Sequence, residues 1–96
     1  MKIKLELMNG AQDGEEFRIR ETTVIGRDKS AQLSLPLDKY ISRKNSRLVV
    51  EAPDVYLEDL NSTNGTYYEG EKINELVRLY NGDFFRVGRT WMEITW

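Results

Sequence analysis

Apolar and polar residues alternate with a period of two along much of this chain, and that period limits the elements it can form. Near the start, Ile3, Leu5 and Leu7 alternate with lysine and glutamate. Successive side chains of a β-strand point to opposite faces, so this run predicts a strand with one buried face. No window has the 3.6-residue period of an amphipathic helix. Further short runs predict strands near residues 17–19, 24–25, 47–51, 55–59, 66–68, 83–87 and 90–96.

Turn signals separate these runs at short intervals. Asn9-Gly10, Asn64-Gly65 and Asn81-Gly82 are Asn-Gly pairs, which tolerate the positive φ angles of tight turns. Many short strands separated by such turns are typical of a β-sandwich or barrel. A chain of 96 residues can enclose one core. The pattern therefore predicts an all-β fold with a single domain over residues 1–96.

The chain contains neither cysteine nor histidine. Disulfide scaffolds, thiol catalysis, a Ser-His pair and the usual zinc ligands are thereby excluded. We accordingly expect no enzyme, no metal site and no cofactor. The N-terminus lacks the apolar core of a secretory signal, and the longest apolar run is only a few residues. We therefore expect no membrane insertion and a cytoplasmic location.

Positive charge is concentrated in one part of a chain whose net charge is −2. The segment from Arg27 to Arg47 holds six bases and two acids, so it carries +4 and leaves −6 for the remainder. A basic island on an acidic body is typical of an anion receptor. A solvated basic loop is the alternative interpretation.

Three polar segments fall where the strand pattern predicts loops, at residues 25–27, 41–46 and 57–66. If these loops share one end of a sandwich, they bring together two guanidinium groups, an ammonium group, hydroxyls and amides. Arginine binds phosphate through two parallel hydrogen bonds, lysine binds it as a point charge, and hydroxyl and N–H groups donate to the remaining oxygens. The three segments together predict a phosphate-binding site.

The order and spacing of these motifs resemble the forkhead-associated (FHA) domain. Gly26-Arg27 is followed, after a gap of 14 residues, by Ser42-Arg43-Lys44 and then by the run from Asn61 to Thr66. The stretch from Gly82 to Gly88 is similar to the closing strands of that family. The resemblance implies a two-sheet sandwich of about eleven short strands, with binding loops at one end. It also implies an interaction module that recognises phosphothreonine on a partner protein or peptide.

The resemblance further implies a role for each matching position. The family's phosphate-binding positions correspond to Arg27, Ser42, Arg43 and Lys44. The positions that surround the threonine methyl group and hold the main chain of the ligand correspond to Thr63 and Asn64. Gly26 and Gly65 fall on structural positions.

Asn45 departs from the family, which usually has histidine there as a link between two binding loops. Asparagine both donates and accepts hydrogen bonds, so we expect Asn45 to give structural support in the same place, with somewhat less rigid loops. We also expect Asp59 to be a scaffold acceptor for loop donors rather than a catalytic acid.

Two other binding functions compete with phosphothreonine recognition. The first keeps the fold but drops the phosphate, as an FHA-type module that binds a partner through another surface or self-associates. The second is nucleic-acid binding through the basic island. The small size of the island, its acidic surroundings, a pI near 5.2 and the lack of aromatic residues beside Arg43 and Lys44 disfavour the second. We therefore expect no nucleic-acid partner.

Overall fold

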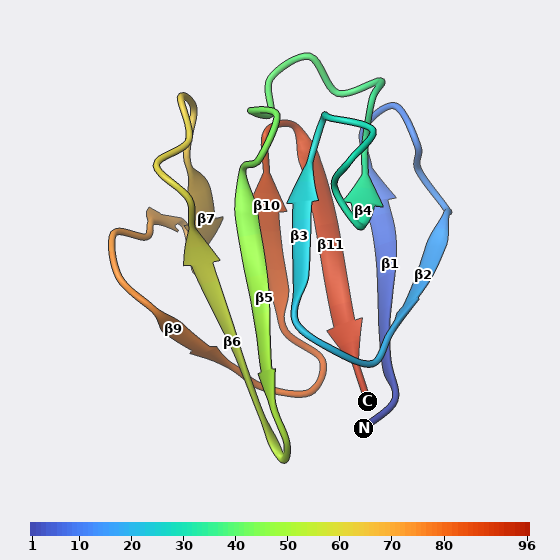
Figure 1. Cartoon of the computed structure of the whole chain (residues 1–96), viewed down its shortest axis with the longest axis vertical. Helices are drawn as coiled ribbons and strands as arrows, with labels where there is room; N and C mark the ends of the chain where they lie inside the picture. The colour runs from blue at the N-terminus through green and yellow to red at the C-terminus, as the bar shows by residue number, and fades with distance from the viewer.

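The computed structural model describes all 96 residues, Met1–Trp96, as eleven β-strands joined by turns and loops (Figure 1). The strands are β1 (Ile3–Asn9), β2 (Glu16–Ile19), β3 (Thr23–Gly26), β4 (Leu33–Ser34), β5 (Ser46–Glu51), β6 (Asp54–Asp59), β7 (Thr66–Tyr68), β8 (Glu71–Lys72), β9 (Val77–Leu79), β10 (Phe84–Val87) and β11 (Thr90–Thr95). The structure contains no helix long and apolar enough to span a membrane.

The strands form two sheets that pack face to face (Figure 1). The first sheet has six strands in the order β2-β1-β11-β10-β7-β8, and the second has five in the order β4-β3-β5-β6-β9. Every pair is antiparallel except β3 with β4. The chain crosses repeatedly between the sheets, so loops that are distant in sequence become neighbours at the ends of the sandwich.

The period-two pattern supplies the layer between the sheets. In β1, Ile3, Leu5 and Leu7 are buried, whereas the residues between them are partly exposed. Seventeen buried apolar side chains from both sheets form one core cluster. Complete burial of such a side chain contributes about 1.5–3 kcal/mol, so this layer is the main source of stability.

The predicted all-β sandwich is confirmed, and so are the longer strands. The Asn-Gly turns are confirmed as well, since Gly10, Gly65 and Gly82 have φ angles of +103°, +92° and +92°. The sequence pattern does not reveal β4, β8 and β9, which contain only two or three residues each. A segment of that length shows no recognisable period, and these strands form because a longer neighbour offers a partner.

The β3–β4, β4–β5 and β6–β7 loops lie at one end of the sandwich, which we call the apical end (Figure 1). Both termini lie at the opposite end. All three polar segments singled out in the sequence therefore reach the same end of the fold.

Two adjacent phenylalanines in β10 test whether the buried layer controls stability. Phe85 is 0% exposed and Phe84 is 47% exposed. We expect Phe85→Ala to lower the free energy of unfolding by about 3–5 kcal/mol, because it removes buried contacts and leaves a cavity. Phe84→Ala is the matched control and changes stability much less. Urea denaturation of both variants gives the comparison, and equal effects would contradict the assignment of the core face.

Candidate functional site

Backbone hydrogen bonds fasten the end of β3 to the segment that precedes β5. The N–H of Arg27 donates to the carbonyl oxygen of Ser42 over 3.0 Å. The next N–H, that of Asp28, donates to the carbonyl oxygen of Arg43 over 3.2 Å. These two bonds hold side by side the two motifs that are separated by 14 residues in the sequence.

Gly26 makes this close approach possible. A Cβ atom at position 26 would lie 1.9 Å from the carbonyl oxygen of Arg43 and 3.0 Å from the Cα of Lys44. Both neighbours are backbone atoms, so any side chain would force the two segments apart. Gly65 meets a different requirement, because its φ of +92° lies in the region that favours glycine.

Three of the side chains predicted to bind phosphate are exposed cations without an ion-pair partner. Arg27, Arg43 and Lys44 are all exposed, and none of them forms a salt bridge. The Nε of Arg27 donates to the carbonyl oxygen of Ile41 over 3.2 Å, which orients the guanidinium group and leaves its two terminal nitrogens free for a ligand. An anion at the apical end therefore meets charge that no carboxylate neutralises.

The third segment joins the other two through side-chain hydrogen bonds. The N–H of Thr63 donates to the Oγ of Ser42 over 3.0 Å, which leaves the hydroxyl proton of Ser42 available to a ligand. The Nδ2 of Asn64 donates to the carbonyl oxygen of Tyr40 over 2.8 Å. The second N–H and the carbonyl oxygen of this amide remain free. Both Thr63 and Asn64 are exposed.

Asn45 lies beneath these loops and is 0% exposed. Its Oδ1 accepts from the N–H of Ser42 over 2.9 Å. Its Nδ2 lies 3.0, 3.2 and 3.4 Å from Ser46 Oγ, Thr66 Oγ1 and the carbonyl oxygen of Gly65. One buried carboxamide thus links the segment before β5 to the segment before β7.

Asp59 ends β6 and accepts hydrogen bonds from its own loop, which confirms that it is a scaffold acceptor. Its carboxylate accepts from the N–H of Ser62 over 3.0 Å, from the hydroxyl of Ser62 over 2.6 Å and from the hydroxyl of Thr66 over 2.7 Å. Burial by itself raises the pKa of Asp59, but these hydrogen bonds and the charge of Lys72 outweigh it. The pKa of Asp59 therefore lies below its ordinary value of 3.8.

Sequence reasoning missed Asp38, which is 5% exposed and supports the loop between β4 and β5. Its carboxylate accepts from the N–H of Tyr40 over 2.9 Å, from the N–H of Arg89 over 2.9 Å and from the hydroxyl of Thr90 over 2.7 Å. The only local signal is the Asx-type bond to the residue two positions later. The bonds to the β10–β11 turn span 51 and 52 residues, and no sequence pattern indicates them.

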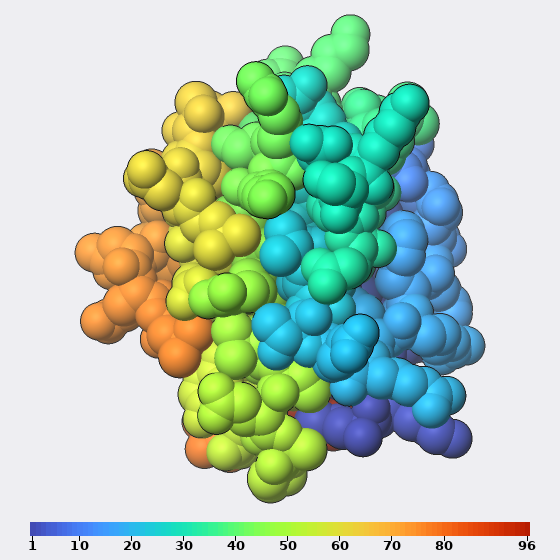
Figure 2. All heavy atoms as spheres, in the orientation of Figure 1, coloured from blue at the N-terminus to red at the C-terminus, as the bar shows by residue number.

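The structure thus brings to the apical end all of the residues that the sequence predicts for the site. They come from the end of β3 and from two loops, whose atoms meet on the surface there (Figure 2). The set comprises Gly26, Arg27, Ser42, Arg43, Lys44, Asn45, Thr63, Asn64 and Gly65. The arrangement offers hydrogen-bond donors and positive charge to an anion and carries no metal-binding cluster of acidic residues.

Comparison with known proteins identifies relatives of this chain. The family model described as "FHA domain" matches residues 23–88. The FHA domain-containing protein FhaB of Mycobacterium tuberculosis is 37% identical over 91 residues, which cover 94% of this chain. The chain spans 58% of the length of that relative.

Solved structures resemble the whole sandwich. A domain from a structural and functional analysis of phosphothreonine-dependent FHA domain interactions has a TM-score of 0.88 and 31% identity, and the match covers 100% of this chain and 97% of that one. The FhaA FHA domain, complexed with the intracellular domain of Rv3910, has a TM-score of 0.84 and 32% identity, covering 96% and 98% of the two chains. The likeness therefore extends well beyond the apical loops.

The lowered pKa of Asp59 predicts a pH-dependent contribution to stability. Because the folded pKa lies below 3.8, the carboxylate contributes fully above that pH and loses its contribution as the pH falls through the folded pKa. We expect Asp59→Asn to lower the free energy of unfolding by about 1 kcal/mol near pH 6, with a gap from the wild type that narrows as the pH falls below 3.8 and through the folded pKa. Denaturation at several pH values measures this gap. Asp13→Asn is the exposed control, and a gap independent of pH would contradict the prediction.

Proposed function

Because the chain belongs to the forkhead-associated (FHA) domain family, we propose that it recognises phosphothreonine on a partner protein. In this proposal the phosphate is held by Arg27, Ser42, Arg43 and Lys44. The methyl group and the main chain of the ligand are held by Thr63 and Asn64. The module acts by binding, without catalysis, and its partner is a protein that a threonine kinase has modified. A cysteine-free chain is compatible with the reducing cytoplasm, where we place this interaction.

The observation that carries the proposal is the convergence of three distant segments on one unneutralised positive cluster. Arg27 contacts the carbonyl oxygen of Ile41, Ser42 contacts Thr63, and Asn64 contacts Tyr40. Each contact joins residues at least 14 positions apart, so the cluster is a product of the fold rather than of local sequence.

The chemistry of the cluster matches that of a phosphorylated side chain. Phosphothreonine carries about −1.5 to −2 charges near pH 7 and three strong acceptor oxygens. The terminal nitrogens of Arg27, the hydroxyl of Ser42 and the ammonium group of Lys44 are donors of the required kinds. The free N–H and carbonyl oxygen of Asn64 suit a peptide backbone, which needs one acceptor and one donor.

The magnitudes indicate moderate affinity. A hydrogen bond to a charged group contributes roughly 1.5–3 kcal/mol, and association costs about 4–15 kcal/mol. Three or four such bonds, together with the main-chain contacts, are therefore consistent with dissociation constants near the micromolar range. Such a complex forms and dissociates readily, as a phosphorylation-dependent contact requires.

Replacement of Arg27 tests the proposal directly. We expect Arg27→Ala to weaken binding of a phosphothreonine peptide, selected from a degenerate library, by at least about tenfold, because charge-assisted hydrogen bonds are lost. Isothermal titration calorimetry measures the change. Lys29→Ala is the matched control, since Lys29 is an exposed base two residues away and outside the cluster. Normal binding by Arg27→Ala would refute the proposed role of the cluster.

Comparison of phosphothreonine with phosphoserine tests the proposed contact of Thr63 and Asn64 with the methyl group of the ligand. Loss of one buried methyl group costs about 0.8 kcal/mol, so we expect the phosphoserine form of the same peptide to bind about fourfold more weakly. The unphosphorylated peptide should show no measurable binding in the same titration. Equal binding of the phosphorylated and unphosphorylated forms would instead support an interaction that does not depend on phosphate.

A further inference from the structure

The strand β2 has one free edge, because it lies at the margin of the first sheet and pairs only with β1 (Figure 1). Leu7 exchanges backbone hydrogen bonds of 2.7 and 2.9 Å with the turn that precedes β2. The odd-numbered residues of β1 therefore direct their backbone N–H and C=O groups toward β2. Their partners in β2 are Phe17 and Ile19. Since backbone groups alternate between the two edges of a strand, Arg18 directs its N–H and C=O away from β1. These groups are available to another strand.

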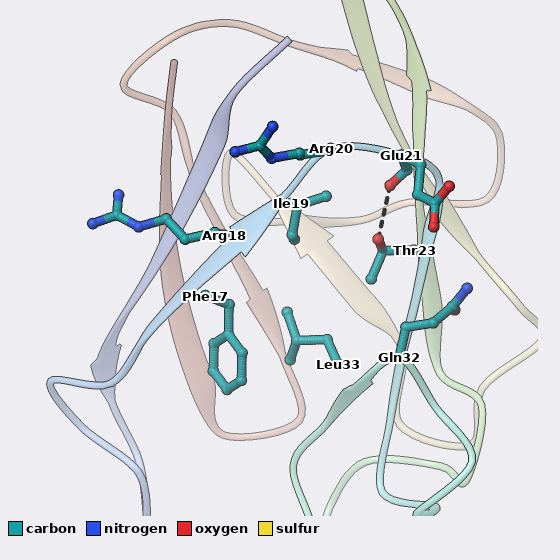
Figure 3. Close-up of a pocket in the computed structure, with 8 residues that line it drawn as sticks. All are labelled: Phe17, Arg18, Ile19, Arg20, Glu21, Thr23, Gln32 and Leu33. Carbon is teal, nitrogen blue, oxygen red and sulfur yellow. Dashed lines mark hydrogen bonds between the residues drawn. The ribbon is translucent and has the colours of Figure 1, made fainter.

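Beside this edge the two sheets part and leave a hollow of about 310 Å³. Phe17 and Ile19 from β2 and Leu33 from β4 gather on one side of it, while the guanidinium group of Arg18 points away from them (Figure 3). A second hollow of about 280 Å³ shares Arg18, Ile19 and Arg20 with the first. The edge thus has an apolar side and a charged side.

Most of the charged residues that line the two hollows are bases. Four of them are bases and one is an acid, namely Lys2, Lys4, Arg18, Arg20 and Glu21. Lys2 and Arg20 form no salt bridge. Lys4 and Arg18 reach a neighbouring glutamate only at 4.0 and 3.8 Å. Glu6 and Glu16 thus offset part of this positive charge, and the unpaired Lys2 and Arg20 attract a negatively charged ligand.

We propose that the free edge of β2 is a second binding site, at which an extended acidic segment of a partner protein adds a strand to the first sheet. Backbone groups of the added strand pair with those of Arg18. Alternate side chains of an extended segment point to opposite faces, so one set reaches the partly exposed Phe17 and the other reaches Arg18 and Lys4. The edge consequently selects a segment in which apolar and acidic residues alternate. This inference does not depend on the phosphothreonine site.

Charge favours an acidic partner over a second copy of this chain. Pairing two β2 edges would add a second set of the unpaired cations Lys2 and Arg20, and like charges across a strand pair are destabilising. Charged side chains on an edge strand generally discourage such self-pairing. An acidic segment has the opposite effect, because it neutralises the cations while it completes the backbone pairing.

The test uses two unphosphorylated synthetic peptides of equal composition and the full chain labelled with nitrogen-15. One peptide alternates glutamate with valine and isoleucine, and the other places all its glutamates before its apolar residues. We expect the alternating peptide to shift the amide resonances of Glu16–Ile19 and to leave those of Arg27, Ser42 and Asn64 unchanged. We expect the block peptide to bind at least about tenfold more weakly by fluorescence anisotropy.

Variants of β2 distinguish the contribution of charge to peptide binding from the contribution of backbone pairing. We expect Arg18→Glu and Arg20→Glu each to weaken binding of the alternating peptide about tenfold, whereas the control Lys29→Glu leaves it unchanged. Arg18→Pro removes the outward N–H at an edge position where proline is tolerated, and should also abolish binding. Thermal melting verifies that each variant is folded. If Arg18→Glu or Arg20→Glu does not fold, the other of these two variants carries the test of charge.

Several results would overturn the proposal. These are equal binding of the two peptides, shifts at the apical loops instead of at β2, and the absence of any shift at millimolar peptide. A dimer that forms through β2 and resists the alternating peptide would show that a second copy is the occupant. None of these outcomes affects the phosphothreonine site, which is tested with Arg27→Ala.

Discussion

The buried carboxamide of Asn45 is the interaction on which the apical loops depend. A polar group moved out of water without a partner loses several kcal/mol of hydration, so such a group is tolerated only when it is hydrogen bonded. The side-chain oxygen of Asn45 is satisfied by Ser42, and its nitrogen by the group of acceptors around Gly65 and Thr66. These partners belong to two different loops. The bonds therefore form together only when both loops are in place, and the requirement for satisfaction fixes one loop relative to the other.

The hydrogen bonds of the apical carboxylates explain why the cations at this end form no ion pairs. Asp28, Asp38 and Asp59 are carboxylates of these loops, and each accepts hydrogen bonds from backbone N–H or hydroxyl donors. None of them forms a salt bridge. Because uncharged donors satisfy these carboxylates, Arg27 and Lys44 form no salt bridge with them. A ligand anion is then attracted by cations that form no salt bridge within the protein.

Much of this organisation can be predicted from the sequence because it follows from short-range rules. Alternation predicts the long strands, Asn-Gly pairs predict turns, and the resemblance carried by residues 26–27, 42–44 and 61–66 indicates which loops matter. The features that the sequence does not predict depend on partners that are distant along the chain. Strands β4, β8 and β9 are too short to have a period of their own, and Asp38 acquires its role from Thr90, 52 residues away. The close approach that requires Gly26 is likewise invisible until the backbone of Arg43 is in place.

The sandwich architecture gives the molecule two chemically different kinds of surface. At the apical end, loops present side chains, so recognition depends on charge and hydrogen-bond geometry at a few atoms of the ligand. Along β2 the exposed groups are those of the backbone, so recognition depends on an extended conformation and on alternation over several residues. A closed barrel has no such edge, whereas a sandwich keeps one at each side of each sheet. A partner that carries both a phosphothreonine and an acidic extended segment engages separate groups of the domain. The second contact is then intramolecular, and the affinity of the pair exceeds that of either contact alone when the linker spans both sites.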